Sequence, residues 1–208
     1  MFYDRHEAGE MLADKLKKYR RRGVVVYGLP RGGVIVAKEV ARLLQAPLSI
    51  IVTRKITHPA SPEYAIGAIG EHTELIFNEA EYSQIDPRWL RAETEKERRE
   101  LLRRKQKYLA GRKPLSAHGK VAIIVDDGIA TGLTMQAAIE EVRKQDPIKL
   151  VVAVPVAPAE TTKMLGELAD EVVVVEKPRL FRGAVGAYYD QFEQTTDAEV
   201  LEALSSGP

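Results

Sequence analysis

Short apolar runs alternate along the chain with longer segments whose apolar residues recur at helical spacing. The apolar runs cover residues 24–27, 48–52, 121–125, 149–154 and 172–175. Such runs are typical of strands that are buried on both faces of a parallel sheet. The helical patterns between and after them cover residues 34–44, 135–142 and 159–168. This order predicts an α/β fold with a doubly wound, mainly parallel sheet of about five strands.

Helices are also expected at both ends of the chain. Residues 6–20 have an amphipathic pattern and end in basic residues, as the C-terminal turn of a helix prefers. The apolar stripe of this helix consists of Met11, Leu12, Leu16 and Tyr19. Residues 197–204 have the pattern of a short closing helix.

A hairpin and a long helix are expected in the middle of the chain. Two short strands, 64–69 and 74–77, flank a turn and give the hairpin. Asp86 followed by Pro87 is the signature of a helix start, and the helical pattern extends to about Tyr108. Both elements come before the third apolar run.

We expect one domain, residues 1–208, whose 45% hydrophobic content suffices for an ordinary core. The hairpin and long helix form a flap inserted at 64–118, and residues 176–208 form a C-terminal segment. The net charge of +1 gives no global field for nucleic acid or membrane. No apolar run approaches ~18 residues, so we expect neither a membrane span nor a signal peptide. The absence of cysteine suits a reducing, cytoplasmic compartment.

The long helix is basic although the chain as a whole is not. Residues 88–112 contain ten Lys and Arg residues against four Glu. One interpretation is a solvated helix with i,i+4 ion pairs such as Glu100–Arg104. The other is a basic flap over a ligand, or a patch for RNA. We expect this helix to be peripheral to the core, so that its arginines contribute little to stability.

The strongest candidate for chemistry follows the third apolar run. Asp126 and Asp127 come directly after it, and a turn of Gly and Thr leads into the next helix. Ligands of open α/β sheets lie beyond the carboxyl ends of the strands, and amides at a helix start favour phosphate. Ionised carboxylates accept hydrogen bonds from hydroxyl groups. The sequence therefore predicts a site that holds a phosphate and a polyol side by side, such as ribose 5-phosphate.

Two further strand ends carry glycine or positive charge. Gly32 and Gly33 let the backbone approach a ligand closely, and Arg31 beside them suits phosphate. Arg54 and Lys55 follow the second apolar run. We expect these cations to face the same crevice as the acidic turn, although a solvated strand end is the alternative for the second pair.

The acidic turn resembles the phosphoribosyl-pyrophosphate (PRPP) motif of type I phosphoribosyltransferases. The residues that carry the resemblance are Asp126, Asp127, Gly128, Ala130, Thr131, Gly132, Leu133 and Thr134. In that family the two acids hold the ribose hydroxyls, and the turn holds the 5-phosphate. Arg31, Gly32 and Gly33 resemble the family's pyrophosphate loop. Arg54 and Lys55 resemble an Arg-Lys pair of orotate phosphoribosyltransferases that contacts pyrophosphate.

The resemblance implies a Mg²⁺-dependent enzyme of nucleotide salvage that moves the 5-phosphoribosyl group of PRPP to a nitrogen of a nucleobase or related acceptor. Asp126, Asp127 and Lys55 are the expected catalytic residues. Asp126 and Asp127 are also the expected Mg²⁺ environment, with most ligands from substrate and water. The family further implies a non-proline cis peptide before Arg31. We expect a homo-oligomer, with no nucleic acid or membrane as partner.

The acceptor is less well defined by the resemblance. Phe181 and Tyr188 lie in a segment similar to the one that frames the base in hypoxanthine-guanine phosphoribosyltransferases, where an aromatic ring could stack on a heterocycle. Core packing is the alternative for both residues. Ala130 stands where those enzymes have an aspartate, which argues against a 6-oxopurine acceptor. The turn is nearer to that of adenine enzymes.

A PRPP-responsive regulator that uses the basic helix on RNA is the main alternative function. Such a protein would keep the fold without turnover. Because a sensor has less need of a pyrophosphate loop, the presence of all three strand-end elements favours an enzyme.

Overall fold

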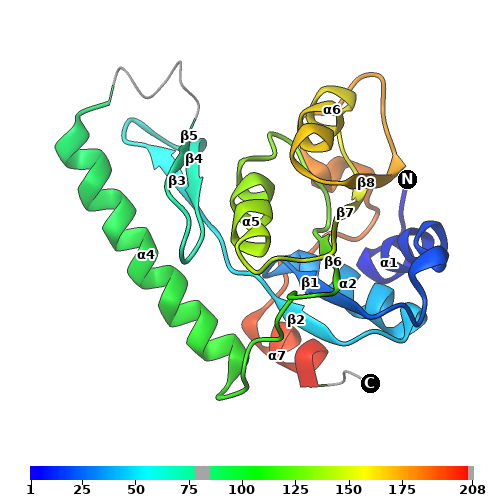
Figure 1. Cartoon of the computed structure of the whole chain (residues 1–208). Helices are drawn as coiled ribbons and strands as arrows, with labels where there is room; N and C mark the ends of the chain where they lie inside the picture. Colours follow the sequence, from blue (N-terminus) through cyan, green and yellow to red (C-terminus); the bar gives the residue numbers. More distant parts are fainter. Residues whose placement is uncertain (78–84, 206–208) are drawn as a thin grey trace.

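The computed structural model describes residues 1–77 and 85–205, so parts of the predicted flap and C-terminal segment lie outside the described residues. Its centre is a parallel sheet with the strand order β2-β1-β6-β7-β8 (Figure 1). The strands are β1 (Val24–Gly28), β2 (Leu48–Ile50), β6 (Val121–Val125), β7 (Lys149–Val156) and β8 (Glu171–Glu176). The predicted five-stranded parallel sheet is confirmed.

Helices cover both faces of this sheet, as the doubly wound prediction requires (Figure 1). One face carries α1 (Arg5–Lys15) and α2 (Gly32–Leu44), and the other carries α5 (Leu133–Arg143) and α6 (Ala159–Leu168). Successive strand residues point to opposite faces. In β1, residues 24 and 26 are therefore buried against α1 and α2, and residues 25 and 27 are buried against α5 and α6. No helix in the described part of the chain is long and apolar enough to cross a membrane.

The first helix is shorter than its pattern predicts. α1 ends at Lys15, and Lys17–Tyr19 form a separate 3₁₀ turn. Leu12 and the two later residues of the expected stripe are buried, whereas Met11 is 44% exposed. The buried side of α1 is centred on Leu12, Ala13 and Ala8, and Met11 is turned by about 100° from Leu12 in the direction away from Ala13.

A second, antiparallel sheet, called the flap sheet below, has the order β3-β4-β5 and begins before residue 64, the predicted start of the flap. Its strands are β3 (Arg54–His58), β4 (Ser61–Ile69) and β5 (Ile76–Phe77). β4 and β5 confirm the predicted hairpin. β3 was not expected, because Ile56 is the one apolar residue among its five and a single residue shows no alternation.

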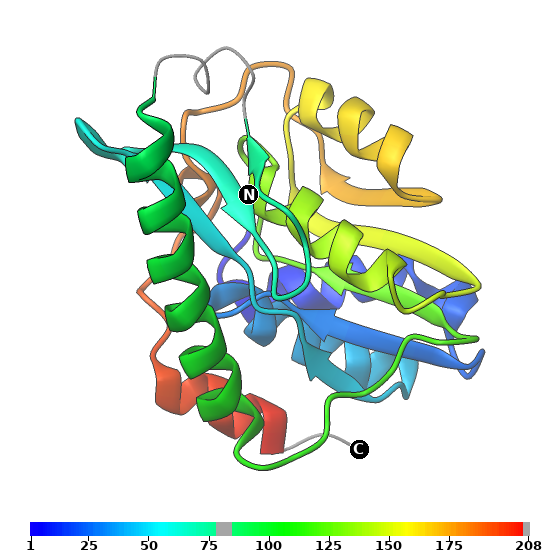
Figure 2. The same cartoon turned by 60° about the vertical axis from the view of Figure 1, so that its left-hand side comes forward.

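The long helix, α4 (Pro87–Leu109), begins where the sequence predicts, and the Asp86 side chain accepts a hydrogen bond from the Arg88 backbone N–H at 2.8 Å. The expectation that α4 is peripheral to the core is wrong. Its buried residues are Leu90, Glu97, Leu101 and Tyr108. The apolar ones share a core with β3, β4 and α7 (Asp197–Ser205), and Figure 2 shows α4 lying along the flap sheet with α7 at its C-terminal end.

The loop between β4 and β5 is fixed from two sides. The guanidinium group of Arg98, on α4, donates hydrogen bonds to three carbonyl oxygens of the loop 70–73 at 2.7 to 3.3 Å. From the other side, Glu141 of α5 lies 2.7 Å from His72 Nδ1 and accepts the His72 backbone N–H at 2.9 Å. The loop therefore joins the flap to the main sheet.

We predict that Arg98→Gln lowers the melting temperature by about 4–8 °C. The change leaves three carbonyl oxygens without their charged donor, at a cost of roughly 2 kcal/mol, and one kcal/mol corresponds to about 2–4 °C at this size. Arg103→Gln is the matched control, because the Arg103 side chain is 61% exposed and pairs only with Glu100 among the described residues. Thermal unfolding followed by circular dichroism measures both. If both variants lower the melting temperature by the same small amount, the hydrogen bonds of Arg98 are not needed for stability.

Candidate active site

A cleft of about 620 Å³ opens where the carboxyl ends of β1 and β6 meet the start of β3. This is the edge at which open α/β sheets bind ligands. Most predicted site residues line it, namely Arg31, Gly32, Arg54, Lys55, Asp126, Asp127, Gly128, Ala130, Thr131, Gly132 and Thr134. Gly33 and Leu133 are not among the described residues that line the cleft. All three strand-end elements nevertheless converge there.

The acidic pair lies on the floor of the cleft. The Asp127 backbone N–H donates to Asp126 Oδ1 at 2.9 Å. Burial raises the pKa of the Asp126 carboxyl well above its usual range, and the negative charge of Asp127 adds to the increase. The positive charge of Lys55 acts in the opposite direction. Ionising Asp126 beside Asp127 is therefore costly, so the pair favours a ligand that brings a cation or hydroxyl donors to offset that cost.

The arginine-glycine loop, Arg31 to Gly33 at the start of α2, packs directly against the acidic pair. A Cβ on Gly33 would lie 2.7 Å from Asp126 Oδ1 and 2.8 Å from the Asp126 Cα. A Cβ on Gly32 would collide with Asp127 Oδ2. Only glycine allows this close approach of two backbones. The peptide between Pro30 and Arg31 is cis, as the resemblance implied.

The Gly and Thr turn presents the beginning of α5 to the cleft. Gly132 has a φ of 84°, a left-handed conformation that suits glycine, and α5 begins at the next residue. The carbonyl of Ala130 accepts a hydrogen bond from the Thr161 hydroxyl at 2.7 Å, which ties the turn to α6. No described side chain caps this helix end. Its free amides and the helix dipole therefore favour a phosphate.

Cations surround the acidic pair from several elements. Arg31 Nη1 lies 3.9 Å from Oδ1 of Asp197, a residue of α7. Lys55 is exposed at the start of β3. Both side chains line the cleft, so both are available to an anionic ligand. A role of Lys55 in ligand binding stays a prediction, because its exposure fits a solvated strand end as well.

The basic helix reaches the same cleft. Arg104 and Glu97 of α4 line it, and Arg54 Nε donates to Glu97 Oε2 at 2.6 Å. Arg104 Nε also donates to Glu100 Oε1 at 2.7 Å, so the predicted i,i+4 pair is present. α4 thus carries exposed ion pairs and also forms one wall of the cleft, which favours the flap interpretation over an RNA patch.

The two aromatic residues expected at the acceptor are not brought into the cleft. Tyr188 is 1% exposed, and Phe181 stacks on it with ring centroids 5.4 Å apart. They pack in a separate apolar cluster, so the core-packing alternative holds for both. Val185 and Phe192, from the same C-terminal segment, line the cleft instead.

Sequence reasoning missed two residues that contact the acidic pair. Arg5 Nε donates to Asp127 Oδ2 at 2.8 Å, and the Tyr189 hydroxyl donates to the Asp127 carbonyl oxygen at 2.6 Å. Arg5 lies 122 positions from its partner, so no local pattern indicates the pairing. Burial raises the pKa of Tyr189, which keeps its hydroxyl protonated as a donor.

One group of potential metal ligands lies outside the cleft. Glu71, His72 and Glu141 bring three ligand atoms within 4.8 Å of one another. The sequence showed no such spacing among the histidines. Glu71 already pairs with Lys105, and His72 pairs with Glu141, so the group is explained as an ion-pair junction between the flap and α5.

These features define an α/β protein whose cleft combines an acidic pair, an arginine with two glycines and an uncapped helix start. Residues 3–191 match the family model of the phosphoribosyl transferase domain. The chain belongs to this family.

Particular relatives agree with this assignment. The chain is 44% identical over 206 residues to two provisionally named phosphoribosyl transferases of Mycobacterium tuberculosis, MT0597 and Rv0571c. The match covers 98% of this chain and 46% of each relative, so the chain spans about half their length. The crystal structure of TT1426 from Thermus thermophilus superposes with a TM-score of 0.81 at 41% identity, covering 98% of this chain and 97% of that one.

Proposed function

We propose that this protein transfers the 5-phosphoribosyl group of PRPP to a nitrogen of a nucleobase or related acceptor and releases pyrophosphate. The observation that carries the proposal is the convergence of three elements in one cleft. The acidic pair suits the ribose hydroxyls, the uncapped start of α5 suits the 5-phosphate, and the arginine-glycine loop suits pyrophosphate.

The reaction separates an anionic leaving group from a sugar with oxocarbenium character. It therefore needs neutralisation of charge and orientation of the ribose more than a covalent nucleophile. In the proposal, Asp126 and Asp127 orient the ribose through its hydroxyls. Arg31 and Lys55 neutralise the departing pyrophosphate, and Arg104 adds a cation from the flap.

The donor set fits Mg²⁺. Asp126 and Asp127 are oxygen donors, which this ion prefers, and two protein carboxylates are enough for an ion that keeps most of its water or substrate ligands. Asp127 Oδ2 already accepts a hydrogen bond from Arg5, and Asp126 Oδ1 accepts one from the Asp127 backbone N–H, which leaves Asp127 Oδ1 and Asp126 Oδ2 for an ion or its water. When held by these carboxylates, Mg²⁺ would supply positive charge that offsets the negative charge of the phosphorylated substrate.

The acceptor is proposed to be a planar heterocycle. Ile129, Val185 and Phe192 give the cleft apolar surface beside the acidic pair, which suits a base. Ala130 offers no carboxylate to take a proton from a 6-oxopurine. We therefore expect hypoxanthine and guanine to be poorer acceptors than adenine or another base.

The proposal is tested by pyrophosphate release from PRPP with Mg²⁺ and a panel of bases. Release that depends on one acceptor, with the corresponding 5-phosphoribosyl product identified by mass spectrometry, would support it. PRPP breakdown at the same rate with no acceptor would indicate a hydrolase instead.

A further inference from the structure

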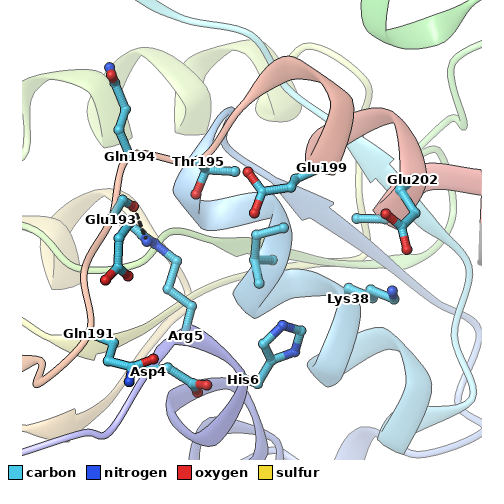
Figure 3. Close-up of a pocket in the computed structure, with 12 residues that line it drawn as sticks. Asp4, Arg5, His6, Lys38, Gln191, Glu193, Gln194, Thr195, Glu199 and Glu202 are labelled. Carbon is cyan, nitrogen blue, oxygen red and sulfur yellow. Dashed lines mark hydrogen bonds between the residues drawn. The ribbon is translucent and has the colours of Figure 1, made fainter.

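Arg5 stands between the cleft and a second cavity. The second cavity has a volume of about 310 Å³ and lies among α1, α2 and the C-terminal segment (Figure 3). Arg5 lines both spaces, yet its side chain is only 12% exposed. A guanidinium group buried to this degree needs partners for its donors.

The partners of Arg5 come from both sides of the cleft floor. Nε donates to Asp127 Oδ2 at 2.8 Å, and a terminal nitrogen donates to the Glu193 carbonyl oxygen at 2.9 Å, the bond drawn in Figure 3. The guanidinium carbon lies 3.9 Å from the centroid of the Phe192 ring. A planar guanidinium can make directed hydrogen bonds and stack on a ring at the same time. Arg5 therefore fastens the C-terminal segment to one oxygen of the acidic pair.

Asp127 is held at two points as a result. Arg5 engages Oδ2, and Tyr189 engages the backbone carbonyl at 2.6 Å. The carboxylate cannot rotate without losing a charge-assisted hydrogen bond in a half-buried site. Its other oxygen, Oδ1, keeps a fixed direction. The arginine also offsets one of the two negative charges, which lowers the repulsion within the pair.

We propose that Arg5 is a positioning residue for the ribose of the substrate, acting through Asp127. The inference rests on the proposed function, since it concerns how the acidic pair holds the ribose. It implies that Arg5 affects ligands that contain ribose and leaves pyrophosphate binding to the separate arginine-glycine loop.

The test compares three ligands by calorimetry with Mg²⁺ present: PRPP, ribose 5-phosphate and pyrophosphate. We expect Arg5→Gln to weaken the two ribose ligands by about tenfold, as loss of a charge-assisted hydrogen bond does, and to change pyrophosphate binding less than about twofold. The affinity of Arg5→Lys for the two ribose ligands should lie between those of the wild type and Arg5→Gln, because lysine keeps the charge without the planar geometry. Arg42→Gln removes a guanidinium outside the cleft that joins α2 to α1 through Glu10 and pairs with Glu39 in its own helix, and it should change none of the three.

The outcomes separate a positioning role from a structural one. Equal weakening of all three ligands would overturn the inference, because general disruption would explain it. Unchanged ribose 5-phosphate and PRPP affinities would overturn it as well. If Arg5→Gln fails to fold, Arg5→Lys makes the same comparison between ligands. Failure of the wild-type protein to bind either ribose ligand would overturn the proposed function, and this inference with it.

Discussion

Replacing Asp126 and Asp127 together by Asn should weaken PRPP binding by about 100-fold or more while the protein stays folded. Each carboxylate is expected to accept a charged hydrogen bond that contributes roughly 1.5–3 kcal/mol. Asn keeps an oxygen that can accept the backbone N–H bond now made by Asp126 Oδ1. The change also removes repulsion between two half-buried charges, and this gain offsets the loss of the Arg5 partner on Asp127.

Calorimetry with PRPP and thermal unfolding measure the two effects separately. The single variants should differ in stability, with Asp126→Asn equal to or above wild type and Asp127→Asn below it. Asp14→Asn, at an exposed ion pair on α1, is the control and should leave PRPP binding unchanged. Wild-type affinity in the double variant would show that the acidic pair does not hold the ligand.

Gly33→Ala should destabilise the fold by about 2–3 kcal/mol and weaken PRPP binding by at least about tenfold. The added Cβ would lie 2.8 Å from the Asp126 Cα, so two backbone segments must separate. Any shift moves the Asp126 carboxylate away from the position at which it contacts the ligand, and small displacements of positioning groups have large effects on function. Urea unfolding and PRPP titration of the same sample measure the two losses.

Gly166→Ala provides the matched control for that change. Gly166 lies in α6, and an added Cβ there meets nothing within 4 Å. Alanine in an exposed helix should raise the unfolding free energy by about 0.5–1 kcal/mol and leave PRPP binding unchanged. If Gly33→Ala changes the unfolding free energy and PRPP affinity in the same way as Gly166→Ala, the close approach of the loop to the acidic pair is required for neither stability nor binding.

The main sheet was predictable because its strands are buried on both faces. Runs such as 121–125 and 149–154 consist almost entirely of apolar residues, and helical patterns separate them. β3 was not predictable by the same means. It pairs along a flap sheet rather than inside the core, so its residues 54–58 are mostly polar and show no period.

The cleft was predictable as far as local motifs define it. The strand-end motifs are short and local, and they include Asp126, Gly132 and Arg31. In each motif the glycines indicate a turn, and the neighbouring charged residues indicate what the turn could bind. The contact between Arg5 and Asp127 depends on where the first helix and the C-terminal segment meet, which no local pattern encodes. For the same reason the sequence could not distinguish Tyr188, which is packed away, from Phe192, which lines the cleft.

The role of α4 depended on tertiary structure in a similar way. Its charges indicated a solvated helix, and the helical spacing that places Leu90, Leu101 and Tyr108 on one face could not show what that face packs against. Leu101 and Tyr108 are seven residues apart, so they lie on one face and reach the core of the flap. The remaining charged side chains then serve different purposes. Arg98 fixes a loop, and Arg104 lines the cleft.

Calorimetric titration of the wild-type protein with PRPP and Mg²⁺ tests the central claim most directly. The cleft combines sites for a phosphate, a diol and pyrophosphate, so PRPP should bind at one site per chain and more tightly than ribose 5-phosphate or pyrophosphate alone. Prior saturation with PRPP should abolish the heat of both smaller ligands, because each occupies part of the same cleft. No binding of PRPP at about 1 mM, the upper end of ordinary substrate affinities, would contradict the account.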